Sequence, residues 1–163
     1  MGLLSMGEAT GSGAEDEAAA EESDVDEPEG FSAEVLAPHA TFPDEVAASF
    51  GIDFERDGEE TVSLSDASNV VVAKFTVEPG GTSGWHAHPG PVIVNVAEGE
   101  AEITFSDDCV THTYTAGEAF IDSGNHAEKA TNPSETERAV LLATFIGVPD
   151  GEPPTEWVEP PDC

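Results

Sequence analysis

The most constraining feature of the sequence is a series of short segments, between residues 61 and 149, in which apolar and polar side chains alternate. Residues 71–77 carry Val, Ala, Phe and Val at every second position, and residues 101–105 carry Ala, Ile and Phe in the same way. A period of two residues is the pattern of β-strands with one buried face. Gly, Pro, Asp and Asn between the segments are typical of turns that join antiparallel strands. This region therefore predicts an all-β domain.

Two further segments of this region are apolar at nearly every position. They are residues 91–97 (PVIVNVA) and residues 139–148 (AVLLATFIGV). Strands covered on both faces have this composition, so we expect both segments inside the domain. A chain of 163 residues suits one compact domain, and about eight short strands suit a β-barrel or jelly roll.

The flanking segments divide the chain into four parts, residues 1–30, 31–60, 61–149 and 150–163. The first part holds ten acidic residues and no Lys or Arg, which predicts a disordered acidic tail. The second carries enough apolar side chains for an arm that packs on the barrel, with a short helix near residues 44–49. The third is the barrel. The fourth is a Pro-rich tail that we expect to be extended, with Trp157 packed against the barrel.

Acidic residues dominate the whole chain. Lys and Arg number 4 against 35 Asp and Glu, which gives a formal net charge of -31. This charge repels nucleic-acid phosphates and anionic lipid headgroups, and no apolar run is long enough to cross a bilayer. The composition predicts a protein that binds neither nucleic acid nor membranes. A carboxylate-covered surface also indicates adaptation to concentrated salt.

The two ends of the chain carry weaker signals about location and redox state. Residues 1–6 (MGLLSM) contain no basic residue that leads into a hydrophobic segment, as an export signal would. We expect a soluble protein with the cytoplasm favoured, and an exported protein with an incomplete leader is the alternative. Cys109 and Cys163 are too few for a disulfide framework, so free thiols are expected.

The segment that carries chemistry is GGTSGWHAHPGP at residues 80–91. His86 and His88 occupy positions i and i+2, which project to the same side of a strand, so their imidazoles can share one ion. Imidazole nitrogens suit Fe, Mn, Zn, Ni and Cu. The spacing favours one divalent transition metal without selecting it. Two histidines with no ligand role are the alternative that this spacing alone leaves open.

The same segment resembles the first motif of the cupin superfamily. That motif reads Gly, five residues, His-x-His, three or four residues, Glu, six residues, Gly. Gly80, His86, His88 and Gly99 fall on it. Val92 occupies the glutamate position, which places an apolar side chain where a typical cupin has a carboxylate.

A second segment, GEAFIDSGNHAEKATN at residues 117–132, is similar to the second cupin motif. That motif reads Gly, five residues, Pro-x-Gly, two residues, His, three residues, Asn. Gly117 and Asn132 match it, but Ser and Asn replace the Pro and the second Gly. Glu128 stands at the position of the ligand histidine, and His126 lies two positions earlier.

The resemblance implies a cupin jelly roll, a double-stranded β-barrel with one metal in its mouth. His86 and His88 would bind the ion together with either His126 or Glu128. His126 would give a site similar to that of three-histidine cupin dioxygenases, and Glu128 would give two histidines and a carboxylate, an arrangement used for oxygen chemistry at Fe(II). We slightly favour His126, because Val92 already removes one carboxylate and neutral imidazoles would keep the same ions bound.

The expected function is therefore that of a metal-binding cupin-domain protein. The leading interpretation is a dioxygenase-like or other metal-dependent enzyme that acts on a small oxygen-rich or enolisable molecule. A non-catalytic module that holds a small ligand is the alternative, and a structural protein without metal is a third. Cupins often pair through their barrels, so the resemblance also implies a homodimer.

Four other residues are assigned no part in the chemistry. His112 alternates with neighbouring strand residues, and His39 lies in an irregular segment. Trp85 should point away from the metal pair and pack. Cys109 has no activating base nearby in the sequence, so it is not interpreted as a nucleophile.

Overall fold

The structure is a computed structural model that describes residues 25–54 and 58–163. Most of the predicted acidic tail therefore lies outside the described residues. The described residues form twelve strands and no helix. This part of the chain therefore has no helix that could span a membrane. The strands are β1 (Glu29–Thr41), β2 (Ala48–Phe54), β3 (Gly58–Leu64), β4 (Asn69–Thr82), β5 (His86–Ala87), β6 (Val92–Glu98), β7 (Glu100–Phe105), β8 (Thr111–Thr115), β9 (Ala119–Asp122), β10 (Glu128–Thr131), β11 (Ala139–Ile146) and β12 (Glu156–Trp157).

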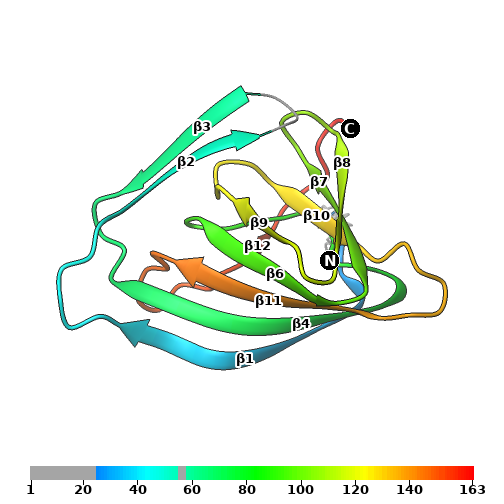
Figure 1. The fold of residues 1–163 in the computed structure, drawn as a ribbon, viewed down its shortest axis with the longest axis horizontal. Helices are drawn as coiled ribbons and strands as arrows, with labels where there is room; N and C mark the ends of the chain where they lie inside the picture. Colours follow the sequence, from blue (N-terminus) through cyan, green and yellow to red (C-terminus); the bar gives the residue numbers. More distant parts are fainter. Residues whose placement is uncertain (1–24, 55–57) are drawn as a thin grey trace, which may run out of the picture.

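Ten of these strands form one antiparallel sheet that curls into a barrel with two layers (Figure 1). One layer has the order β1-β4-β11-β6-β9, and the other has the order β12-β5-β10-β7-β8. The layers are joined where Thr131 of β10 pairs with Thr82 of β4. Strands β2 and β3 form a separate hairpin. The predicted all-β class and double-stranded barrel are confirmed.

The core of the barrel lies between the two layers and follows the predicted alternation. On β11, Leu141, Ala143 and Phe145 are buried, and they pair with residues of β4. Strand β11 also pairs with β6, so the two nearly continuous apolar segments lie side by side within the sheet. The expectation that both are covered on both faces is wrong for β6, where buried residues alternate with half-buried and exposed ones. Full burial of a side chain such as Phe145 contributes about 1.5–3 kcal/mol.

The N-terminal segment, where an arm packed on the barrel was expected, begins with a long strand. Strand β1 pairs along nearly the whole of β4, so it is part of the main sheet. The predicted helix near residues 44–49 is wrong, because residues 42–47 form bends and irregular chain before β2. The Val46 carbonyl accepts a hydrogen bond from the Ala67 N–H at 2.7 Å, and this tertiary bond replaces the local bonding that a helix would need.

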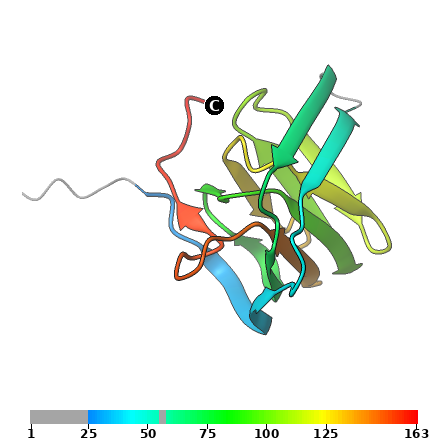
Figure 2. The same ribbon diagram turned by 90° about the vertical axis from the view of Figure 1, so that its left-hand side faces the viewer.

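The C-terminal segment is attached to the barrel (Figure 2). Strand β12 pairs with β5, and the Trp157 indole N–H donates to the Ser83 carbonyl at 2.9 Å. Cys163 forms a disulfide with Cys109 across 54 positions of sequence. The expectation of free thiols is therefore wrong, because the returning tail brings the chain end to the connection between β7 and β8.

Candidate metal centre

Two buried histidines from β5 and the residue after its end form one half of the site. His86 Nδ1 donates to the Gly84 carbonyl at 3.0 Å, and His88 Nδ1 donates to the Pro154 carbonyl at 2.8 Å. A carbonyl oxygen only accepts, so each Nδ1 carries a proton. In the neutral rings the lone pair is therefore on Nε2, which is the state that binds a metal.

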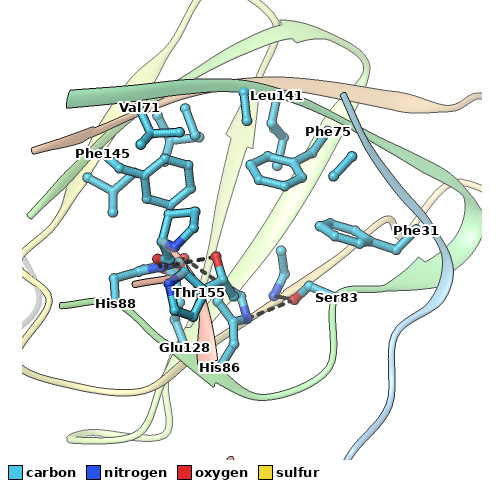
Figure 3. Close-up of a pocket in the computed structure, with 18 of the residues that line it drawn as sticks. Phe31, Val71, Phe75, Ser83, His86, His88, Glu128, Leu141, Phe145 and Thr155 are labelled. Atoms are coloured by element: carbon cyan, nitrogen blue, oxygen red, sulfur yellow. Dashed lines mark hydrogen bonds and ion pairs between the residues drawn. The ribbon is translucent and has the colours of Figure 1, made fainter. Parts of the chain in front are cut away.

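Glu128, the first residue of β10, completes a group of three. It pairs with His86 across β5 and β10. Its Oε1 atom lies 3.4 Å from His86 Nε2 and 3.6 Å from His88 Nε2. Figure 3 shows the three side chains converging from neighbouring segments. One ligand atom from each lies within 4.8 Å of the others, so the three residues are close enough to bind one ion.

His126 does not join this group in the structure. Its side chain is 34% exposed, and its Nε2 atom lies 3.7 Å from a Glu60 oxygen and 3.9 Å from an Asp107 oxygen. His126 lies in a bend, and β10 begins only at Glu128. The rule that alternate side chains share a face applies only within a strand. The geometry therefore groups Glu128, and not the slightly favoured His126, with the histidine pair.

The turn before β10 explains this placement. Gly124 has φ of +78°, and an added Cβ would lie 2.5 Å from the Gly90 carbonyl oxygen. A side chain would be strained there by both the backbone conformation and the close approach. The tight contact fixes the bend that contains His126 against the segment after His88. Counting from Gly117 and Asn132 had placed Glu128 at the ligand position, and that spacing was the more informative signal.

Two polar residues hold β10 against β4. The Ser83 hydroxyl oxygen accepts the Ala130 N–H at 2.9 Å. The Asn132 side-chain amide donates to the Val77 carbonyl at 2.9 Å and to the Glu137 carbonyl at 2.8 Å. Both side chains are buried, so these bonds position the strand that presents Glu128.

Sequence reasoning missed one buried carboxylate beside the site. Asp122 ends β9 directly opposite Val92 of β6. Its Oδ1 atom accepts the Gly124 N–H at 2.8 Å, and its Oδ2 atom lies 3.6 Å from His88 Nε2. Oδ2 is buried and has no hydrogen-bond partner among the described residues. Asp122 occupies none of the motif positions, so only the register of β6 and β9 reveals it.

The two buried carboxylates have opposite electrostatic character. Burial and the charge of Glu128 raise the pKa of Asp122 to about 7, although His88 and the Gly124 N–H act in the opposite direction. Burial also raises the pKa of Glu128, but hydrogen bonds and attraction from His86 and His88 outweigh it and lower that pKa to about 2. Burial lowers the pKa of His88, whereas Glu128 and Asp122 raise it, and the net direction is upward. The raised pKa values of Asp122 and His88 favour the binding of protons by these two residues, which offsets part of the negative charge of the two carboxylates.

A cavity of about 260 Å³ opens beside these residues, and its two walls differ in chemistry. Figure 3 shows His86, His88 and Glu128 on one side and a group of aromatic and aliphatic side chains on the other. The apolar wall comes mainly from β1, β4 and β11. It includes Phe31, Val71, Phe75, Leu141 and Phe145. Residues 153–155 of the tail and Trp157 also line the cavity.

The donor set fits a divalent transition metal. Ligand atoms about 2.1 Å from one ion at tetrahedral angles are about 3.4 Å apart, and the nitrogen-oxygen separations here are 3.4 and 3.6 Å. Glu128 Oε2 is buried without a hydrogen-bond partner among the described residues, as expected of a carboxylate that serves an ion. Two imidazoles and a carboxylate suit Fe, Mn, Zn, Ni or Cu and do not distinguish them.

The comparison with protein families agrees with this geometry. Residues 73–145, which include the two histidines and Glu128, match the family model described as Cupin domain. The chain carries a cupin domain. The resemblance seen in the two motifs is thus confirmed, and the cupin match spans β4 to β11 almost completely.

Solved structures similar to this chain include the following three proteins. A protein of Klebsiella pneumoniae with a double-stranded β-helix domain is 21% identical, with 56% of this chain and 76% of that chain covered and a TM-score of 0.46. The polyketide cyclase RemF of Streptomyces resistomycificus is 22% identical, with 57% and 63% covered and a TM-score of 0.47. A cupin-like protein of Thermotoga maritima is 21% identical, with 55% and 65% covered and a TM-score of 0.47. No curated protein matches the sequence significantly.

Proposed function

We propose that this cupin binds one divalent transition metal through His86, His88 and Glu128 and uses it to act on a small molecule. The observation that carries the proposal is the convergence of two inward-facing Nε2 atoms and one carboxylate oxygen at the wall of a cavity. Three protein ligands leave coordination positions open for a substrate. A dioxygenase-like reaction is the enzyme class that this donor set suits best, since two histidines and a carboxylate bind Fe(II) in many oxygenases.

The chain contributes orientation and charge to such a reaction. When bound, the ion would polarise a substrate oxygen or activate dioxygen. The carbonyls of Gly84 and Pro154 fix the two imidazole rings, which raises the basicity of the ligand nitrogens. Glu128 supplies one negative charge that favours a cation in a buried place. The apolar wall excludes water, which strengthens electrostatic interactions within the site.

The cavity wall narrows the class of substrate. Phe, Val, Leu and Ala side chains cannot pair with hydroxyl or carboxylate groups, and an unpaired buried polar group costs about 1–3 kcal/mol. An oxygen-rich molecule therefore fits the wall poorly. We propose a small, mainly apolar and enolisable molecule whose single oxygen-bearing end faces His86, His88 and Glu128.

Metal content of matched variants tests the metal site. Wild type, His86→Ala, Glu128→Gln and His126→Ala are loaded identically with Fe(II), Mn(II), Zn(II), Ni(II) or Cu(II), desalted and analysed for metal. Wild type and His126→Ala should retain one ion per chain, whereas His86→Ala and Glu128→Gln should lose at least nine-tenths of it. His126→Ala is the control, because it removes a nearby histidine outside the group. Absence of bound metal in wild type would refute the proposal.

A second measurement separates an enzyme from a binding module. Oxygen uptake by the Fe(II)-loaded protein is recorded with a panel of phenols and 1,3-diketones, alongside sugars and hydroxy acids as polar comparators. An enzyme of the proposed class consumes oxygen with the apolar group and loses this activity in His86→Ala. Saturable binding of these compounds without turnover would favour the non-catalytic module.

A further inference from the structure

We propose that Asp122 is a fourth protein ligand of the metal, in place of the glutamate whose motif position is occupied by Val92. The proposal rests on the metal site proposed above. It adds a carboxylate from β9 to the two histidines and Glu128. Neither of the two motifs assigns a role to this residue.

The register of β6 and β9 places Asp122 next to the vacant glutamate position. Val92 and Asp122 are directly opposite partners in this antiparallel pair. Directly opposite residues project to the same face, with Cβ atoms about 4.5–5.5 Å apart. Val92 lines the cavity beside the histidines. A carboxylate on β9 can therefore reach the region that a glutamate on β6 would serve.

The Asp122 side chain is also presented as a ligand would be. Its Oδ1 atom is occupied by the Gly124 N–H, which orients the carboxylate. Its Oδ2 atom is buried, has no hydrogen-bond partner among the described residues, and lies 3.6 Å from His88 Nε2. Glu128 Oε1 lies at the same 3.6 Å from that nitrogen. Both distances to His88 Nε2 are close to the spacing of about 3.4 Å between two ligands of one ion. Asp122 lies outside the group of His86, His88 and Glu128 whose ligand atoms are all within 4.8 Å of one another, so ligation requires its Oδ2 atom to move toward the ion.

Charge balance gives a reason for a second carboxylate. Asp122 is fully buried, at 0% exposure, and Glu128 is 5% exposed. Two buried carboxylates with no cation are costly, because a buried charge must be paired. Two carboxylates, two neutral imidazoles and one divalent ion together have no net charge. Asp122 is also absent from the cavity lining, so its coordination leaves the cavity side of the ion open.

The first test compares Co(II) binding by wild type and Asp122→Asn. Asparagine keeps an oxygen to accept the Gly124 N–H and replaces the other oxygen with an amide nitrogen that cannot ligate. We expect the Co(II) dissociation constant to rise at least tenfold and the visible absorption of the bound ion to change. Asp66→Asn is the matched control, because Asp66 Oδ1 accepts the Ser68 N–H at 3.0 Å in the same i to i+2 geometry. This control should bind Co(II) as wild type does.

A relocation experiment sharpens the test. The double variant Val92→Glu with Asp122→Asn moves the carboxylate from β9 to the opposite position on β6. We expect the Co(II) dissociation constant of this double variant to be at least tenfold lower than that of Asp122→Asn. Circular dichroism of each metal-free protein checks that the barrel is folded. If Asp122→Asn does not fold, a crystal structure of wild type soaked with Co(II) decides, with Oδ2 expected about 2.0–2.2 Å from the ion.

Different results overturn different claims. Wild-type affinity and spectrum in Asp122→Asn would refute the fourth ligand and leave the three-residue site intact. Weaker binding with an unchanged spectrum would show that Asp122 acts only by positioning His88, which also refutes direct ligation. A Co(II) ion more than 3 Å from Asp122 Oδ2 in the soaked crystal would likewise refute direct ligation. Failure of wild type to bind Co(II) or any other loaded metal would instead refute the proposed function itself.

Discussion

The two walls of the cavity are built in different ways. The apolar wall belongs to long paired strands, above all β4 and β11, and its side chains are part of the main core. The polar wall belongs to short elements, since β5 has two residues and β10 has four. Its side chains are held by individual hydrogen bonds from a turn and from the tail. Regular strands thus supply stability, and short elements at their ends supply the reactive groups.

The largest expected effect on stability contrasts one residue from each wall. Phe145 is 1% exposed and contacts both Phe75 and His88 edge to face. Phe145→Ala should lower the free energy of unfolding by about 3–5 kcal/mol, the usual cost of such a cavity. In metal-free protein His86→Ala should cost less, because Glu128 keeps His88 as a partner when the contact with His86 is lost. Urea denaturation with a chelator measures both, and equal losses would contradict the contrast.

The next effect concerns the tail that supports the polar wall. Cys163→Ser removes the bond to Cys109, and loss of a disulfide typically costs about 2–4 kcal/mol. It should also weaken metal binding, on the order of tenfold, because a looser tail holds the Pro154 carbonyl less firmly against His88 Nδ1. Denaturation and metal titration measure the two effects. The double variant with Cys109→Ser should equal the single one, and a further large loss would indicate that the thiol has another role.

The pH dependence of metal-free stability should reveal the buried carboxylates. The Asp122 pKa is raised from 3.8 to about 7, so the folded state binds the extra proton in this window and stability falls as pH rises through it. The Glu128 pKa is lowered from 4.5 to about 2, so its contribution is lost as pH falls below 4.5. The raised pKa of His88 acts in the same direction as that of Asp122. Denaturation of metal-free wild type and Asp122→Asn at several pH values measures this dependence. Between pH 4 and 7 the free energy of unfolding should fall less steeply with pH in the variant than in wild type.

The smallest expected effect comes from the exterior, where charges are exposed. Repulsion within a chain of net charge -31 should be relieved by salt, since the Debye length falls from about 30 Å at 0.01 M to about 3 Å at 1 M. We expect the melting midpoint to rise with KCl by a few degrees, at about 2–4 °C per kcal/mol gained. A flat or falling midpoint between 0.05 and 3 M KCl would count against salt adaptation. The Phe145→Ala loss should be nearly unchanged by salt, because it concerns apolar burial.

Local patterns in the sequence were enough to predict the fold and the histidine pair. Alternation of apolar side chains identifies strands because successive residues of a strand face opposite sides. The same rule places His86 and His88 together. Alternation alone did not separate His126 from Glu128, because the chain before Glu128 bends at Gly124 and does not continue the strand.

The sequence by itself determined the all-β class, the barrel and the histidine pair, because each depends on spacing between near neighbours. Only the tertiary structure decided that Glu128 joins the pair, that Asp122 lies opposite Val92, and that the tail returns to line the cavity. These features depend on strand register and on contacts between distant segments. Cys109 and Cys163, for example, are 54 positions apart, and no periodicity of either segment indicates that they meet.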